Sequence, residues 1–151
     1  MSLQQEVELL RNIPLFAKIE PSKLKLLAFT SQRLTFAAGD IVFEQGDTGD
    51  AAYIIIGGEA DVIVDTPGGQ LVVATLKQNE VVGEIAILCD VPRTATVRAR
   101  EQMTTLRISK ELFFNLVVEF PEIAVEIMRE LAHRLEQTTA RLREAVAKSQ
   151  S

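Results

Sequence analysis

The chain has 151 residues, of which 47 % are hydrophobic and 25 % are charged, with a net charge of −5 and a pI near 5.0. This length accommodates one domain with a substantial core, and no apolar run is long enough to cross a bilayer. The acidic balance argues against direct nucleic acid binding, because affinity for a phosphate backbone needs clustered Lys and Arg. The single cysteine excludes an intrachain disulfide, and with no secretory pattern at the N-terminus it favours a cytoplasmic protein.

The first 32 residues predict two amphipathic N-terminal helices. Apolar residues recur at intervals of three and four from Leu3 to about Leu10, and again from Ser22 to Phe29. Pro14 and Pro21 separate the two segments. We therefore expect a helical region of residues 1–32 in front of the main body of the domain.

Residues 33–109 have the pattern of a β unit. Short β-branched or aromatic runs alternate with Gly-Asp, Gly-Gly and Pro-Gly-Gly turns. About eight strands are expected, near residues 33–37, 41–43, 52–56, 59–65, 70–76, 80–82, 94–100 and 103–108. Strands of this number and length predict a mostly β fold with flanking helices, built on an eight-stranded β jelly roll or a barrel.

Residues 110–148 predict a pair of C-terminal helices. Ser109 is a suitable N-cap for the first, and Pro121 can only open the second. The second helix carries a heptad seam, made of Met128, Leu131, Leu135, Thr138, Leu142 and Ala145. This seam has two interpretations: the helix packs on its own roll, or it pairs with a second copy in a homodimer.

The segment from Val82 to Val97 carries the most informative chemistry. Gly83 permits a positive φ or a close backbone approach, and Glu84 to Leu88 can form a short helix whose free N–H groups face an anion. Arg93 offers a planar fork for two phosphate oxygens, whereas an ionised Glu84 accepts a hydrogen bond from a sugar hydroxyl. Spacing alone leaves open a simple structural ion pair between the two side chains.

Two motifs in this segment, Gly83-Glu84-Ile85-Ala86 and Pro92-Arg93-Thr94-Ala95, resemble the phosphate-binding cassette of the cyclic nucleotide-binding domain family. The resemblance runs from about residue 12 to 140, through Pro14-Leu15-Phe16, the turn at residues 44–47 and Gly58-Glu59. It implies a β-roll with flanking helices that binds cAMP or cGMP, with cAMP favoured. It also implies a regulatory sensor in signal transduction rather than an enzyme.

The resemblance also implies a role for each matching residue. Arg93 would bind the cyclic phosphate and Glu84 the ribose 2′-hydroxyl. Gly83 and the backbone of Ile85 and Ala86 would complete the cradle, and Thr94 and Ala95 would add hydroxyl or amide donors. Val62 and Val73, on facing strands, would form an apolar wall for the base, although both also suit an ordinary core.

The sequence departs from the family pattern at residues 77–82, where a Gly-Asp turn and a Phe usually precede the cassette glycine. Asn79 tolerates a left-handed backbone almost as well as glycine, so the turn can survive. Loss of the aromatic residue changes the packing behind the cassette. Both charged ligand-contact positions are present, which favours a binding-competent copy.

The expected mechanism is a two-state switch in which phosphate capture draws the cassette inward and a hinge near Phe120-Pro121 repositions the last helix. Candidates for a lid over the base are Arg134, Leu135, Thr138 and Arg141.

An alternative is a non-binding interaction or dimerisation module in which Glu84 and Arg93 pair with each other. A metal site or a catalytic triad is disfavoured because the chain has one histidine, His133. No output domain follows Lys148, so we expect a free-standing sensor or the regulatory part of a protein with an unidentified effector domain.

Overall fold

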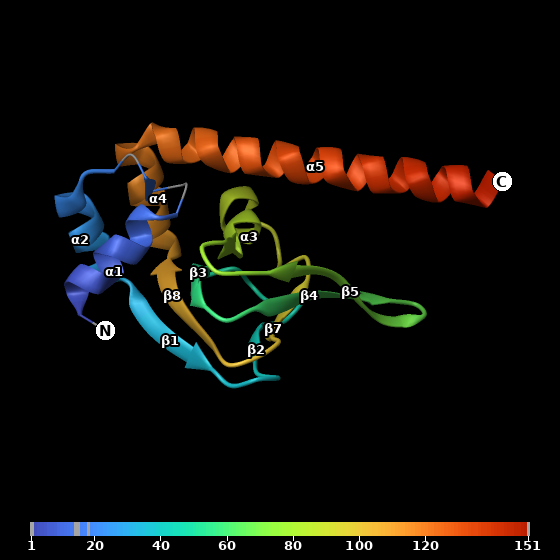
Figure 1. The fold of residues 1–151 in the computed structure, drawn as a ribbon, viewed down its shortest axis with the longest axis horizontal. Helices are drawn as coiled ribbons and strands as arrows, with labels where there is room; N and C mark the ends of the chain where they lie inside the picture. Colours follow the sequence, from blue (N-terminus) through green and yellow to red (C-terminus); the bar gives the residue numbers. More distant parts are fainter. Residues whose placement is uncertain (1, 14–15, 18, 151) are drawn as a thin grey trace.

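The computed structural model describes residues 2–13, 16–17 and 19–150, and Figure 1 shows the arrangement of its helices and strands. Pro14 and Leu15, which contribute to the sequence resemblance, lie outside the described residues. The helices are α1 (Leu3–Arg11), α2 (Pro21–Thr30), α3 (Glu84–Cys89), α4 (Lys110–Glu119) and α5 (Pro121–Gln150). The strands are β1 (Gln32–Phe36), β2 (Ile41–Phe43), β3 (Ala51–Gly57), β4 (Ala60–Thr66), β5 (Gly69–Leu76), β6 (Val81–Val82), β7 (Thr96–Ala99) and β8 (Met103–Ser109).

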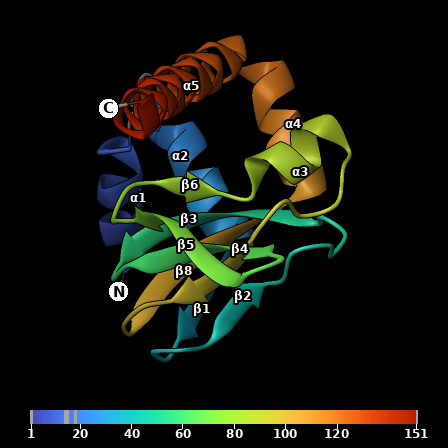
Figure 2. The same cartoon turned by 90° about the vertical axis from the view of Figure 1, so that its right-hand side faces the viewer.

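The strands form two four-stranded antiparallel sheets, as the predicted β-roll requires. One sheet has the order β1-β8-β3-β6, and the other has the order β2-β7-β4-β5. The helices α1, α2, α4 and α5 gather on one side of this roll, while α3 lies between the strands and α5 (Figures 1 and 2). The fold is therefore mostly β with flanking helices.

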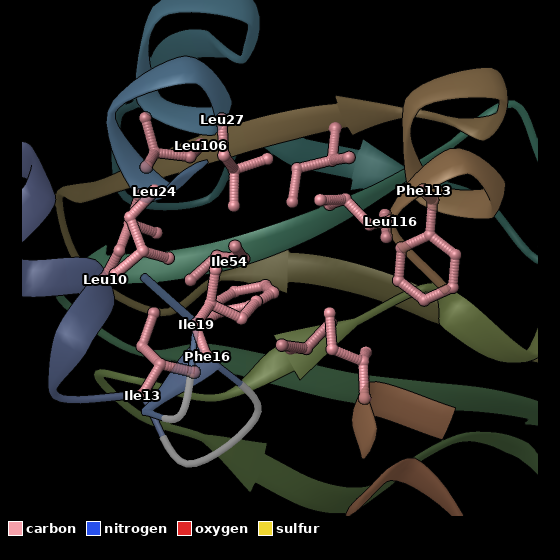
Figure 3. Packing of buried hydrophobic residues seen from close by; sticks show 14 of the residues in the cluster. Leu10, Ile13, Phe16, Ile19, Leu24, Leu27, Ile54, Leu106, Phe113 and Leu116 are labelled. Carbon is pink, nitrogen blue, oxygen red and sulfur yellow. The ribbon is translucent and has the colours of Figure 1, made fainter. Parts of the chain in front are cut away.

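The core has two parts, one on each side of the β1-β8-β3-β6 sheet. The larger part packs α1, α2, α4 and the start of α5 against that sheet, and Figure 3 shows ten of its residues by name. Ile54 and Leu106 lie side by side in the register of β3 and β8, and both are buried beneath the helices. The smaller part fills the interior of the roll around Ile55, Leu76 and Val97. Burial on both faces explains why β3 reads as a nearly continuous apolar run.

The segment between the two C-terminal helices is built as its sequence predicts. The Ser109 hydroxyl accepts a hydrogen bond from the Leu112 amide at 3.2 Å and caps α4. Phe120 ends α4 in a non-helical backbone conformation, with φ −125° and ψ 81°, and Pro121 opens α5. Figure 1 shows α5 running across the roll, over α3 and past β5. This course places the middle of α5 opposite the cassette.

Two strands, β6 and β7, are shorter than the sequence pattern predicts, and β7 differs more. The expected strand at residues 94–100 is β7, which begins only at Thr96 and ends at Ala99. Before this strand, the backbone of Arg93 is held instead by the 44–47 turn, because its amide donates to Asp47 O at 2.7 Å and its carbonyl accepts from the Gly46 amide at 2.8 Å. Thr94 and Ala95 therefore lie in the cassette and not in the ladder.

Candidate functional site

The cassette begins with a left-handed glycine. Gly83 has φ +90°, follows β6 and forms the N-cap of α3. A Cβ at this position would lie 2.6 Å from Arg93 Nη1 and 3.3 Å from the Ala51 carbonyl oxygen. Both the backbone conformation and the lack of space require glycine here. The turn before it survives the departure from the family pattern, since Asn79 adopts the left-handed φ of 74°.

The Arg93 side chain is folded into the wall of the roll. Its Nη1 donates to the Gly83 carbonyl and its Nη2 to the Ala51 carbonyl, both at 2.7 Å, and the residue is 3 % exposed. The carboxylate of Asp50 lies 3.8 Å from Nη2. Burial lowers the pKa of Arg93, and Tyr53 and Asp50 partly offset this effect. The Nε atom is buried and has no hydrogen-bond partner among the described residues.

Glu84 begins α3 and is also buried, at 5 % exposure. Its carboxylate lies 3.5 Å from the Arg134 guanidinium, which reaches across from α5. Burial raises the pKa of Glu84 from its ordinary value of 4.5, while a hydrogen bond from the backbone and the charge of Arg134 oppose this shift. A buried acceptor with one cationic partner is thus presented at the start of the cassette helix.

Glu84 and Arg93 have different ion-pair partners, Arg134 and Asp50 respectively. The alternative interpretation expected Glu84 and Arg93 to pair with each other, but the closest charged partner of each is a different residue. Each has only a minor electrostatic influence on the pKa of the other. Both side chains line the same cavity, each with its own partners.

The cassette forms one wall of a cavity of about 510 Å³. All nine residues singled out from the sequence line this cavity: Val62, Val73, Gly83, Glu84, Ile85, Ala86, Arg93, Thr94 and Ala95. Val62 and Val73 lie on neighbouring antiparallel strands, β4 and β5, at an irregularity in their register. Val73 is 42 % exposed, so much of its surface is open to the cavity and to solvent and is not ordinary core.

The opposite wall is formed by α5. Of the four predicted lid residues, Arg134, Thr138 and Arg141 line the cavity, whereas Leu135 lies 67 % exposed and does not. Gln137 and Phe43 also line it, and sequence reasoning missed both. Helical spacing from Arg134 to Arg141 was the available signal for Gln137. No sequence signal marked Phe43, because one aromatic residue in a short strand suits any roll interior.

Within residues 2–13, 16–17 and 19–150, no three His, Cys, Asp or Glu side chains come together in a way that could hold a metal ion. No helix in the described part of the chain is both long and apolar enough to span a membrane.

A β-roll with a buried arginine and a buried glutamate lining one cavity has the architecture of a regulatory ligand-binding domain. Residues 33–120 match the family model of the cyclic nucleotide-binding domain. The chain therefore belongs to the cyclic nucleotide-binding domain family.

Individual relatives agree with this assignment. The cAMP-dependent protein kinase regulatory subunit of Blastocladiella emersonii is 34 % identical over 115 residues, which are 76 % of this chain and 28 % of that protein. The CRP-like cAMP-activated global transcriptional regulator of Mycobacterium tuberculosis is 28 % identical over 140 residues, or 92 % of this chain and 62 % of the regulator. The catabolite activator protein of Thermus thermophilus has the same fold, with a TM-score of 0.76 and 29 % identity over 85 % of this chain and 61 % of that one. The chain thus spans less than two thirds of each of these proteins.

Proposed function

We propose that this chain is a single regulatory domain, cytoplasmic and not catalytic, that binds a 3′,5′-cyclic nucleotide in the cavity between the cassette and α5. The observation that carries the proposal is the buried Nε of Arg93, a donor without a partner among the described residues, on a cationic side chain that lines the cavity. A buried unpaired donor costs about 1–3 kcal/mol, so its retention calls for an acceptor. A cyclic phosphate oxygen would supply that acceptor and the compensating negative charge.

The remaining contacts follow from the walls of the cavity. The phosphate would lie between Arg93 and the amides of Ile85 and Ala86 at the start of α3. The ribose 2′-hydroxyl would donate to the Glu84 carboxylate, which is buried within the same segment. Val62 and Val73 would cover one face of the base, and Thr94 would offer a hydroxyl at its edge.

We propose cAMP ahead of cGMP as the ligand. Two relatives of this chain, the kinase regulatory subunit and the CRP-like regulator, are both named for cAMP. On the other wall, Gln137 and Thr138 offer side chains that pair with either base edge, and the Thr138 hydroxyl donates to Arg134 O at 2.9 Å. That internal bond leaves the Thr138 oxygen as an acceptor, which suits the amino group that adenine carries at C6, where guanine carries a carbonyl oxygen.

Ligand capture would be transmitted through α5. The support for this proposal is the 3.5 Å contact between Arg134 and Glu84, which joins the last helix to the residue that would bind the ribose. A hydroxyl that engages Glu84 competes with Arg134 for the same carboxylate, so the two states of α5 have different affinities for the ligand. The hinge would be Phe120-Pro121, where the helical backbone is interrupted.

We also propose that a second copy of the chain pairs along α5. Ile123 and Ile127 of this helix are buried on the roll, but the seam residues Met128, Leu135 and Leu142 are 60 %, 67 % and 62 % exposed. These three recur every seven residues, which is the repeat of a two-chain coiled coil. An unidentified effector would then read the position of the paired helices.

The test is calorimetric titration of the chain with cAMP, cGMP and 5′-AMP, after denaturation and refolding to remove any copurified nucleotide. Saturable binding of a cyclic nucleotide with much weaker binding of 5′-AMP supports the proposal, and the cAMP to cGMP ratio decides the base preference. A folded sample that binds neither cyclic nucleotide would overturn it and favour an interaction module.

A further inference from the structure

The guanidinium of Arg93 lies over the ring of Phe43. The Arg93 Cζ atom is 4.0 Å from the ring centroid, which is cation–π contact distance. Phe43 is the last residue of β2, in the sheet opposite to the one that contains β3 and β6. The aromatic face therefore comes to Arg93 from a different sheet than the carbonyl groups that accept its hydrogen bonds.

These contacts restrain the guanidinium in complementary ways. The carbonyls of Gly83 and Ala51 fix the Nη atoms within the guanidinium plane. They leave the tilt of that plane undetermined, because a carbonyl oxygen accepts over a broad range of directions. The flat ring of Phe43 removes this freedom, since stacking requires the guanidinium to lie across its face.

The Phe43 ring is itself held in place by a second aromatic residue. Its centroid is 6.0 Å from that of Tyr53, with an interplanar angle of 37°. Tyr53 is 7 % exposed and pairs with Val82 in the β3-β6 ladder, one residue before the cassette glycine. A Cβ on Gly83 would also lie 3.2 Å from the Phe43 ring. Phe43, Tyr53, Gly83 and Arg93 thus pack as one unit.

We propose that Phe43 is a positioning residue for the anion subsite, which acts on the cyclic phosphate through Arg93. This inference rests on the proposed function. The ring holds the guanidinium in a single plane before the ligand arrives. The unpaired Nε is therefore already oriented for the phosphate, and binding costs no further conformational entropy of the Arg93 side chain. Because the ring excludes water from one face of a buried cation, it also reduces solvent screening of the attraction between the guanidinium and the phosphate.

The informative variant is Phe43→Leu, which keeps an apolar side chain but removes the aromatic face. We expect its affinity for cAMP to fall roughly 3- to 30-fold, the range that corresponds to a partly desolvated cation–π contact. Phe43→Tyr retains the face and is expected to retain most of the affinity. The matched control is Phe36→Leu, the same truncation at another partly buried aromatic residue that packs on the same interior cluster. It is expected to leave affinity within about twofold.

Two further readouts separate positioning from packing and from direct contact with the ligand. In the ligand-free protein, the Hε resonance of Arg93 should be shielded by the ring and should move downfield in Phe43→Leu but not in Phe36→Leu. In the Arg93→Lys background, Phe43→Leu should cost much less affinity than in the wild type, because the planar group on which the ring acts is gone. An Hε resonance that keeps its position, or an equal loss in both backgrounds, would overturn the inference. If the wild type bound no cyclic nucleotide, the proposed function would fail, and with it the role at a phosphate, while the resonance would still show whether Phe43 holds Arg93.

Discussion

Arg134 of α5 and Glu84 of the cassette helix lie 3.5 Å apart, and this contact joins the last helix to the centre of the candidate site. Glu84 is buried, whereas the Arg134 side chain is 37 % exposed and also contacts Glu130 at 3.3 Å. The carboxylate is therefore the fixed partner and the guanidinium the movable one. In the proposed mechanism, this contact would carry a change at Glu84 into α5.

Arg134→Ala should weaken this connection. Removing the cation leaves a buried carboxylate with less compensation, so we expect Tm to fall by about 2–6 °C and amide exchange in the middle of α5 to accelerate. Hydrogen exchange followed by mass spectrometry measures the second effect. The control is Arg129→Ala, which removes a cation of the same helix that pairs at 2.9 Å with Glu126, away from the cavity. Equal exchange in the two variants would contradict the proposed route.

Arg93→Ala should abolish most cyclic nucleotide binding. Because a charge-assisted pair with the phosphate is lost, we expect the binding free energy to weaken by about 2 kcal/mol or more, which is roughly a 30-fold loss of affinity in a calorimetric titration. Arg100→Ala is the matched control, because Arg100 is an arginine near the end of β7 whose side chain is 58 % exposed and pairs with Glu59. A folded Arg93→Ala chain that keeps wild-type affinity would contradict the proposal that Arg93 binds the cyclic phosphate.

Gly83→Ala should disturb both stability and binding. The φ of +90° costs an alanine about 1–2 kcal/mol, and the new Cβ would force Arg93 Nη1 away from its position at 2.6 Å. Gly39→Ala separates the two effects, since Gly39 has φ +90° and nothing within 4 Å of a Cβ. We expect both variants to lose stability in denaturant titrations but only Gly83→Ala to lose at least tenfold in affinity. Comparable affinity losses would show that backbone strain alone accounts for the effect.

Glu84 should make the stability of the ligand-free chain pH-dependent. Because burial raises its pKa above 4.5 in the folded state, the folded chain binds this proton more tightly than the unfolded chain. Stability contributed by this group is therefore lost as pH rises from 4.5 through the folded-state pKa. Glu84→Gln should raise Tm at pH 7 by roughly 2–4 °C, flatten the profile in this window and weaken cyclic nucleotide binding. A lower Tm at pH 7 in this variant would show that the pair with Arg134 outweighs the cost of burial.

The exposed seam of α5 predicts a dimer that charge can disrupt. Leu135→Glu combined with Leu142→Glu places repelling carboxylates along the proposed interface, so we expect a monomer by sedimentation where the wild type is dimeric. Ala140→Glu adds a carboxylate on the opposite face of the same helix and should leave the dimer intact. A wild type that sediments as a monomer at high micromolar concentration would exclude pairing along α5.

Much of the architecture was predictable because hydrophobic periodicity and turn residues determine secondary structure locally. The eight strands fall within two residues of their expected positions, since β-branched runs and glycine turns determine them without long-range information. The left-handed Asn79 and the cap at Ser109 follow from the chemistry of single residues. The start of β7 was wrong because a distant turn, at residues 44–47, binds the backbone of Arg93.

The surroundings of the site were less predictable for the same reason. The contact of Phe43 with Arg93 depends on the packing of two sheets, and the pairing of Arg134 with Glu84 depends on the angle at which α5 crosses the roll. The periodicity of α5 offered four lid candidates without ranking them, and the structure turns Leu135 away from the cavity. Sequence patterns locate the cassette, but they do not say which residues of other elements meet it.

The uninterrupted course of α5 has a mechanical consequence. With 30 residues the helix is about 45 Å long, and Arg134 lies about 20 Å from its start at Pro121. A tilt of about 5° at that start moves Arg134 by about 2 Å and the far end by about 4 Å. In the proposed mechanism the helix would act as a lever that doubles a displacement imposed beside Glu84, and the largest movement would occur at its C-terminal turns.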